Sequence, residues 1–116
     1  MDQETRDELA RELTIDITTT GRKTGRPSRI EIWWFRFEDR FIITGRPGRR
    51  DWFANTAANG EITIHINGAD YPATATVVTD EGFRRRMITQ TKTHWYSSQQ
   101  ELERMIDEAP MIEVHL

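Results

Sequence analysis

The chain is organised around the stretch Thr18-Thr19-Thr20-Gly21-Arg22-Lys23-Thr24-Gly25-Arg26-Pro27-Ser28-Arg29, which runs directly into Ile30-Glu31-Ile32-Trp33-Trp34-Phe35-Arg36-Phe37. The first part is a threonine run of high β propensity, followed by a turn that carries two glycines and four basic side chains. The second part is the most hydrophobic and aromatic segment of the chain. A cationic loop beside an aromatic strand suits a ligand that combines an anionic tail with a flat ring.

Charge is distributed unevenly along the chain. The 116 residues carry a net charge of −3, yet residues 21–50 hold nine basic and three acidic side chains, a net of +6. The remaining residues hold seven basic and sixteen acidic side chains, a net of −9. A basic segment within an acidic protein indicates a local anion site rather than a general coat for nucleic acid. The alternative is a set of solvated charges on strands and turns.

Length and composition predict one domain over residues 1–116, built around a single core. No apolar run approaches the roughly 20 residues that span a bilayer, and the acidic, amphipathic N-terminus is unlike a secretion leader. Cysteine is absent, which excludes disulfides, thiolate metal sites and cysteine nucleophiles. We therefore expect a cytoplasmic protein without a transmembrane segment.

Hydrophobic periodicity predicts a mainly β chain of the α+β class. Strands are expected at residues 15–20, 29–37, 40–44, 61–67, 71–79 and 111–116. Helices are expected at residues 3–13, 52–57, 81–92 and 98–108, with Asp51 and Asp80 as the N-caps of the second and third. Strands linked by hairpins, without a βαβ rhythm, favour an antiparallel barrel or closed sheet of about six strands. An N-terminal helix and two to three further helices would lie at its edges.

The strand predicted at residues 29–37 has two apolar faces. Ile30, Ile32 and Trp34 fall on one face, whereas Trp33 and Phe35 fall on the other. One face can fill a core, and the other needs a helix, a partner subunit or a ligand to cover it. The sequence is therefore compatible with a homodimer.

Residue types that usually carry out catalysis are scarce. His65, His94 and His115 are far apart and none has a partner at metal-site spacing, so we expect no metal site. No serine stands at a nucleophile elbow, and the glycines lack the spacing of a Walker or Rossmann motif. Basic side chains and aromatic planes remain, and plain core packing is the alternative for each aromatic. Such a chain can still be an enzyme if a bound cofactor carries the difficult step.

Several segments, in this order along the chain, resemble the deazaflavin-dependent nitroreductase family, which belongs to the flavin- and deazaflavin-binding split β-barrels. They are residues 18–27, 30–34, 44–48, 50–55, 58–59, 62–66 and 109–114. The resemblance implies an antiparallel split β-barrel that holds coenzyme F-420, a deazaflavin with a phosphate and polyglutamate tail.

The resemblance also implies which residues meet the cofactor. Residues 22–24 match the tail-binding motif, Trp33 occupies the position that faces the deazaflavin ring, and residues 44–46 fall along the ring edge. Tyr96 corresponds to a tyrosine that closes the pocket in relatives. Further arginines for the anionic tail and a further tryptophan for the ring complete the expected cofactor-binding set. That set is Arg22, Lys23, Thr24, Arg26, Arg29, Trp33, Thr44, Gly45, Arg46 and Trp52.

The leading hypothesis is an oxidoreductase in which reduced F-420 passes a hydride to an electron-poor small molecule, namely a quinone, a nitro compound or a conjugated carbonyl. Tyr96 is the candidate for donating a proton or packing over this acceptor. One alternative is a cofactor-binding split barrel without turnover, or one that prefers FMN. Another is a small-barrel nucleic-acid binder that stacks bases on Trp33 and Phe35. The net charge of −9 outside residues 21–50 would repel a long polyanion, so we expect no nucleic-acid partner.

Overall fold

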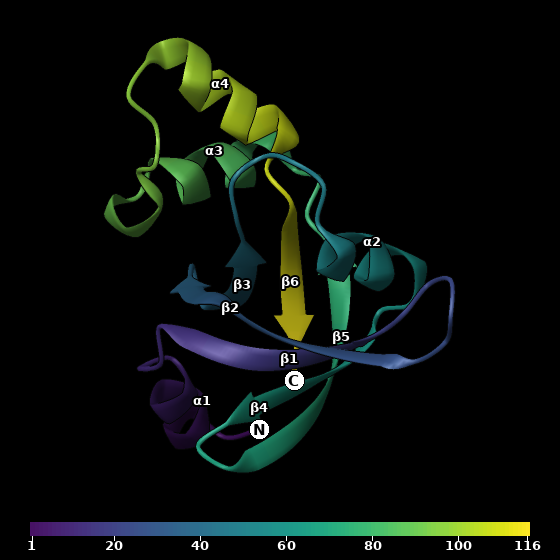
Figure 1. Cartoon of the computed structure of the whole chain (residues 1–116). Helices are drawn as coiled ribbons and strands as arrows, with labels where there is room; N and C mark the ends of the chain where they lie inside the picture. The colour runs from purple at the N-terminus through teal and green to yellow at the C-terminus, as the bar shows by residue number, and fades with distance from the viewer.

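The protein is described by a computed structural model that covers residues 1–116, and its centre is a closed barrel of six antiparallel strands (Figure 1). The strands are β1 (Thr14–Thr20), β2 (Pro27–Phe37), β3 (Arg40–Thr44), β4 (Glu61–Ile66), β5 (Ala69–Val77) and β6 (Met111–His115). Around the barrel they follow the order β1-β2-β3-β6-β5-β4, and β4 pairs with β1 to close the ring. The predicted antiparallel split β-barrel is confirmed.

Strand β2 joins two parts of the barrel. Its first seven residues, 27–33, pair with β1, and its last four, 34–37, pair with β3. The two halves of β2 therefore have different neighbours, although they belong to one continuous strand. Outward-facing side chains of β2 therefore lie beside β1 in its first part and beside β3 in its last part.

The barrel interior is filled by alternate side chains of the strands, as strand periodicity predicts. Trp34 is only 1% exposed and stacks on Phe41, with ring centroids 4.5 Å apart. The other core members from the strands are mostly isoleucines and come from the remaining five strands: Ile15, Ile17, Ile43, Ile62, Ile64, Ile66, Ala75, Ile112 and Val114. Val77, at the end of β5, is 39% exposed.

Helix α1 (Gln3–Leu9) covers one end of the barrel. Asp2 caps it by accepting a hydrogen bond from the Thr5 amide, and Leu9 is buried in the barrel core. The indole Nε1 of Trp34 donates to the carbonyl oxygen of Leu9 at 3.1 Å. The predicted extension to Leu13 is wrong, because the Leu13 carbonyl instead accepts from the Trp34 amide and already belongs to the approach to β1.

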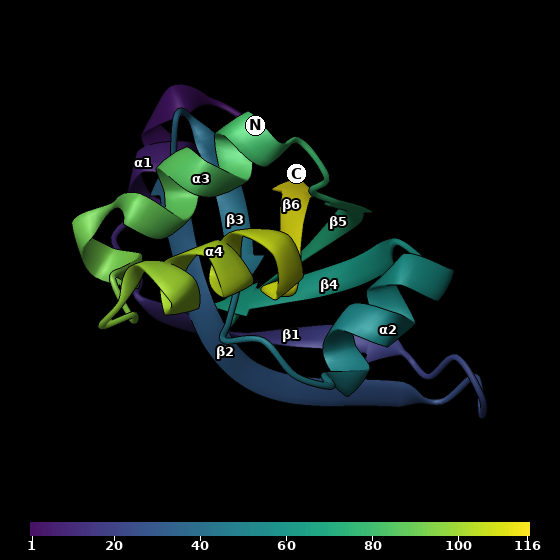
Figure 2. The ribbon, with the colours of Figure 1, turned by 90° about the horizontal axis from the view of Figure 1, so that it is seen from above.

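Helices α3 (Glu81–Thr89) and α4 (Gln99–Glu108), joined through the 3-10 turn η1 (Thr91–Thr93), lie together outside the barrel over β2 and β3 (Figure 2). They cover Phe35 and Ile42 with a second apolar cluster, so of the three expected covers, a helix, a partner subunit or a ligand, helices cover part of this face of β2. Asp80 caps α3 as predicted, but α3 ends at Thr89 because Gln90 is extended. None of the helices combines the length and the apolar character that crossing a bilayer requires.

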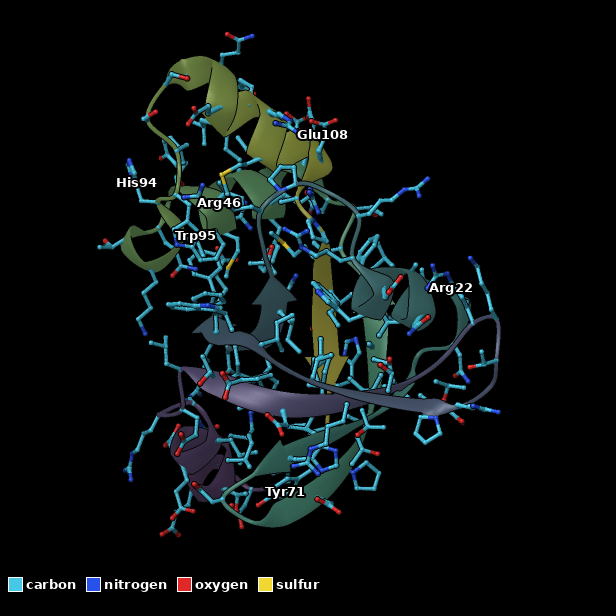
Figure 3. The ribbon with its side chains drawn as sticks, viewed as in Figure 1. Arg22, Arg46, Tyr71, His94, Trp95 and Glu108 are labelled. Atoms are coloured by element: carbon cyan, nitrogen blue, oxygen red, sulfur yellow. The ribbon has the colours of Figure 1, made fainter.

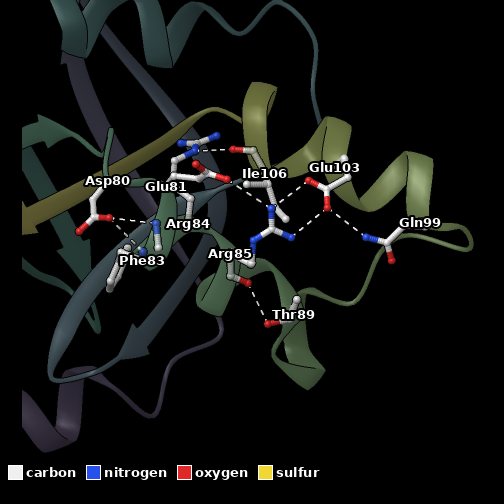
Figure 4. A network of polar contacts seen from close by, with 10 residues as sticks. Asp80, Glu81, Phe83, Arg84, Arg85, Thr89, Gln99, Glu103 and Ile106 are labelled. Carbon is white, nitrogen blue, oxygen red and sulfur yellow. Dashed lines mark hydrogen bonds and ion pairs between the residues drawn. The ribbon is translucent and has the colours of Figure 1, made fainter.

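Arg84 holds α3, α4 and the end of β5 together from a buried position (Figure 4). Its guanidinium donates to the carbonyl oxygens of Ile106 at 2.6 Å, Ala109 at 2.6 Å and Val78 at 3.0 Å. Burial lowers the pKa of Arg84 from its ordinary value. Two of the three carbonyl oxygens, those of Ile106 and Ala109, lie near the C-terminus of α4, where the helix dipole favours a cation.

Candidate functional site

A cationic hollow lies where the loop between β1 and β2, residues 21–26, meets the N-terminal half of α2 (Asp51–Ala58) (Figure 3). The hollow encloses roughly 550 Å³. Four of its lining side chains are cations and one is a carboxylate. They are Arg22, Lys23, Arg49, Arg50 and Asp51, and Gly48, Phe53 and Ala54 complete the lining. The fold thus brings two basic segments, separated in the sequence by the whole of β2 and β3, around one space.

Arg22 is the only cation of this hollow that is anchored to another side chain. Its guanidinium donates to Asn55 Oδ1 at 2.9 Å and to Asp51 Oδ1 at 3.3 Å, and its amide donates to Asn55 Oδ1 at 3.1 Å. Asn55 is buried and also donates to the hydroxyl of Thr19 at 3.2 Å. Asn55 is not among the site residues expected from the sequence. An asparagine in mid-helix, where its side chain competes with helical backbone bonds, was the available signal.

Asp51 does not cap α2, contrary to the prediction. The N-cap position is taken by Arg50, whose side chain makes no capping hydrogen bond, and Asp51 is the first helical residue. The Asp51 carboxylate turns instead towards Arg22, and its side chain is 89% exposed. A carboxylate in the first turn still interacts favourably with the helix dipole, so Asp51 can stabilise α2 while it pairs with Arg22.

The loop of residues 21–26 is closed by its own backbone. The amide of Gly21 donates to the carbonyl of Arg26 and the amide of Gly25 to the carbonyl of Gly21, both at 2.8 Å. Gly25 has φ +70°, which glycine adopts without strain, and Thr24 accepts from the Arg26 amide at 3.2 Å. Thr24 therefore shapes the loop. Lys23 and the Arg26 side chain are exposed and have no carboxylate partner.

A second, smaller hollow lies on the other side of the loop between β3 and α2, residues 45–50. It encloses roughly 220 Å³ and is lined by Arg46, Pro47, Trp95, Glu101, Arg104 and Met105. Hydrogen bonds from the amide and hydroxyl of Ser97, together with the charge of Arg46, hold the pKa of Glu101 below its usual value. Because residues 45–50 border both hollows, a long ligand that lies across this loop can reach the two together.

An aromatic surface adjoins the second hollow. Trp33 is 44% exposed, stacks near Phe35 with centroids 6.2 Å apart, and meets Trp95 edge-on at 6.0 Å. Trp95 in turn lines the hollow of Arg46 (Figure 3). The next residue, Tyr96, is half-buried and stacks on His94 at 4.1 Å. The outer face of β2 thus presents a flat apolar surface where α3 and α4 do not cover it.

Three expected residues lie apart from these hollows. Arg29 forms an ion pair with Asp16 at 2.9 Å on the outer wall of the barrel. Thr44 is buried and donates to the carbonyl of Pro110 at 2.7 Å, which ties β3 to the start of β6. Trp52 is 7% exposed and belongs to the barrel core. Their contacts are structural, whereas Gly45 begins the loop between the hollows and is half-exposed.

The donor set of the two hollows fits a ligand with an anionic end and an aromatic end. Guanidinium and ammonium groups bind phosphate and carboxylate oxygens, and three of the four cations in the larger hollow have no carboxylate to neutralise them. The exposed indole of Trp33 offers a planar surface for a ring. This combination suits F-420, whose tail is anionic and whose deazaflavin ring is flat.

Known structures share this fold over nearly the whole chain. An F-420H2-dependent reductase is 17% identical, with 90% of this chain and 95% of that chain covered and a TM-score of 0.62. A structure described as a domain-swapped dimer is also 17% identical, with 97% and 95% covered and a TM-score of 0.63. A protein of the pyridoxinephosphate oxidase family from Clostridium acetobutylicum is 12% identical, with 99% and 85% covered and a TM-score of 0.66. At these identities the similarity establishes the fold alone.

The amino-acid sequence also matches a protein family. Residues 3–109 match the family described as F-420H(2)-dependent quinone reductase, and they include five of the six barrel strands, both hollows and all four α-helices. This match confirms the resemblance to deazaflavin-dependent reductases that the loop of residues 18–27 and the segment of residues 50–55 indicate. The chain therefore belongs to the F-420H(2)-dependent quinone reductase family and is, with that family, an oxidoreductase.

Proposed function

We propose that the protein, with residues 1–116 acting as one domain, binds reduced F-420 across the loop of residues 45–50 and uses it to reduce a quinone. The observation that carries the proposal is the pairing of two hollows on one loop. One hollow holds four cations and a single carboxylate, and the other adjoins the exposed face of Trp33. Membership of the quinone reductase family supports the cofactor and the acceptor class.

The larger hollow would hold the tail of the cofactor. Lys23, Arg49 and Arg50 supply charge that no carboxylate neutralises, and Arg26 stands at the exposed end of the same loop. Arg22 is held by Asn55 with its guanidinium facing the hollow, so little side-chain entropy remains to be lost on binding. Thr24 would act by fixing the loop rather than by touching the tail.

The aromatic surface would hold the ring. When bound, the reduced deazaflavin supplies the hydride. Trp33 and Trp95 would fix the plane of the ring, and Arg46 and Gly45 would lie along its edge. Packing of the ring against these side chains would exclude water and orient the acceptor, which is the main contribution that such a site can make. Tyr96, beside Trp95, would donate a proton to the acceptor or pack over it.

The acceptor is electron-poor, and a quinone is the class that the family name supports. A nitro compound and a conjugated carbonyl would accept a hydride by the same geometry. Loss of the absorbance of reduced F-420, followed with menadione, with a nitroaromatic and with a conjugated enone, ranks the three classes. No turnover with any of them, despite tight binding of F-420, would show a binding module without this activity.

Binding is tested by titrating the full chain with F-420, with FMN and with a short single-stranded RNA, followed by tryptophan fluorescence. We expect quenching at micromolar F-420 and weaker responses to FMN and RNA. Replacing Lys23 and Arg49 together by alanine should weaken binding of F-420 far more than binding of a tail-less deazaflavin. The matched control, Arg11→Ala with Lys92→Ala, removes two exposed cations outside both hollows. Equal losses of affinity for the two ligands, or in the two double variants, would contradict the proposal that the larger hollow binds the tail of F-420.

We also propose that the chain forms a homodimer, since Trp33 and Leu13 leave apolar surface exposed on one protein copy. The domain-swapped dimer among the similar structures supports the capacity of this fold to pair. Sedimentation equilibrium at micromolar concentrations should give twice the 13.6 kDa mass of one chain. A single species of monomer mass across that range would refute this part of the proposal.

A further inference from the structure

Asp51 is the one carboxylate among the charged side chains of the cationic hollow. Four cations surround the same space, and only Arg22 pairs with Asp51, at 3.3 Å. The side chain of Asp51 is 89% exposed, whereas that of Arg22 is 31% exposed. An anionic ligand that enters the hollow therefore meets a carboxylate of the protein that is already paired with Arg22.

Arg22 is held by Asn55 and by Asp51, and loss of the two contacts would reduce stability by different amounts. Asn55 is neutral, buried and bonded on its other side to Thr19, so it cannot leave without exposing unpaired polar groups. Asp51 makes its ion pair from the exposed first turn of α2 and has no other hydrogen bond. Exposed ion pairs of this kind contribute little to stability and break readily. Asn55 would therefore keep Arg22 in place while Asp51 releases it.

We propose that Asp51 is a built-in competitor for the anionic tail and sets how much negative charge a ligand needs to enter the hollow. Its carboxylate holds Arg22 in the free protein and is displaced when a phosphate or a chain of carboxylates binds. A ligand with a single weak charge gains little, because it exchanges one ion pair for another. A ligand with several charges also engages Lys23, Arg49 and Arg50, which have no competitor. This role rests on the proposed function, because it names the charge selectivity of the same site.

The size of the effect follows from the strength of exposed ion pairs. Removing the competing charge should tighten the binding of a multiply charged anion by about two- to fivefold. The gain should be absent for a ligand that carries the ring without the tail. Asp51→Asn removes the charge and keeps the size of the side chain, and Asp51→Glu keeps the charge.

Glu81 offers a closely matched control. It also stands in the first turn of a helix, α3, and pairs with an arginine, Arg85, at 3.3 Å. Glu81→Gln therefore removes the same charge from an equivalent pair outside the hollow. Any effect that Asp51→Asn shares with Glu81→Gln arises from net charge alone.

The experiment measures, by calorimetric titration of the full chain, the affinities of wild type and the three variants for F-420, for a tail-less deazaflavin and for inorganic pyrophosphate. We expect Asp51→Asn to bind F-420 and pyrophosphate about two- to fivefold more tightly, with Asp51→Glu and Glu81→Gln close to wild type. The tail-less deazaflavin should bind all four proteins alike. An unchanged or weaker affinity of Asp51→Asn for both anions, or an equal gain in Glu81→Gln, would overturn the inference.

The pyrophosphate titration separates this inference from the proposed function. If wild type fails to bind F-420, the proposed function fails, yet tighter pyrophosphate binding by Asp51→Asn still supports the role of Asp51. If wild type binds F-420 and Asp51→Asn gains nothing with either anion, the proposed function stands and the inference fails. Thermal unfolding of each variant verifies that the fold is intact.

Discussion

The side-chain oxygen of Asn55 accepts two hydrogen bonds from one residue, Arg22, whose guanidinium lies 2.9 Å away and whose amide lies 3.1 Å away. One buried amide group thereby fixes both the backbone and the side chain of the β1–β2 loop. The side-chain nitrogen of Asn55 donates to the hydroxyl of Thr19, the last residue but one of β1. Arg22 thus attaches the loop to α2, through its bonds to Asn55 and its ion pair with Asp51.

Replacing Asn55 by alanine should loosen this attachment. The change leaves the Arg22 amide without its partner and should lower the free energy of unfolding by about 1–3 kcal/mol. Amide hydrogen exchange at residues 22–25 should become faster, and F-420 should bind more weakly. Urea unfolding and exchange measured by mass spectrometry check both effects. Gln100→Ala, which removes an exposed amide group without a partner, should change stability by less than about 0.5 kcal/mol.

Replacement by alanine should mainly reduce stability at Trp34 and mainly reduce ligand binding at Trp33. Trp34→Ala empties part of the barrel core and removes the bond to Leu9, so it should cost about 3–5 kcal/mol of stability. Trp33→Ala changes a half-exposed side chain and should cost about 1 kcal/mol or less. Calorimetric titration should show that Trp33→Ala weakens F-420 and tail-less deazaflavin alike, and that Trp33→Phe restores much of the loss. Normal binding by Trp33→Ala would remove Trp33 from the ring site.

Arg84→Met should destabilise the contact between the helix pair and the barrel. The substitution leaves three carbonyl oxygens without their donor and should cost about 2–4 kcal/mol. Lysine at this position can reach fewer of the three oxygens, so Arg84→Lys should fall between wild type and Arg84→Met. Arg104→Met removes an exposed arginine of α4 that pairs with Glu108, and it should change stability little. Equal midpoints of urea unfolding for Arg84→Met and Arg104→Met would contradict this account.

Acid should destabilise the protein from about pH 4.5 downward. Hydrogen bonds from Arg86 hold the pKa of Glu38 below its ordinary 4.5, and those from Arg36 hold the pKa of Asp39 below its ordinary 3.8. The folded state therefore binds fewer protons than the unfolded state in this range. The stability that these carboxylates contribute is present above their unfolded pKa values and is lost as the pH falls through their folded values.

The midpoint of urea unfolding, measured between pH 7 and pH 3, tests this dependence. Glu38→Gln removes one of the shifted groups, so its midpoint should fall less steeply with acid than that of wild type. Glu61→Gln removes an exposed carboxylate that forms no ion pair and should follow the wild-type curve. Parallel curves for all three proteins would mean that the Arg86–Glu38 pair, with nitrogen and oxygen 2.6 Å apart, contributes nothing to acid stability.

The order of strands and helices was predictable because it depends on local periodicity. The alternation in residues 29–37 separates Trp34, which enters the core, from Trp33, which does not, and the structure keeps that separation. The same alternation predicts a second apolar face that needs cover. It does not predict which segment supplies that cover. The cover comes from Phe83 and Met105, far along the chain, through long-range packing that no local pattern encodes.

Contacts of individual polar side chains were the least predictable part. Asp51 has the residue type and position of an N-cap, but a distant arginine competes for its carboxylate and is bound instead. The periodicity that turns Met87 and Ile88 inward also turns Arg84 inward, three and four residues earlier. A charged side chain is not expected to be buried unless carbonyl oxygens in the interior can accept its hydrogen bonds. Those oxygens belong to α4 and to the segments after β5 and α4, so sequence proximity does not reveal them.

The pairing of β4 with β1 closes the ring of strands, so no strand lies at an edge of the sheet along its whole length. Unpaired strand backbone is confined to segments, such as the two halves of β2, which pair with β1 alone and with β3 alone. Another chain therefore finds only short stretches of free amides and carbonyls for strand addition. The same closure limits edge-to-edge stacking of a protein rich in isoleucine strands when it is crowded.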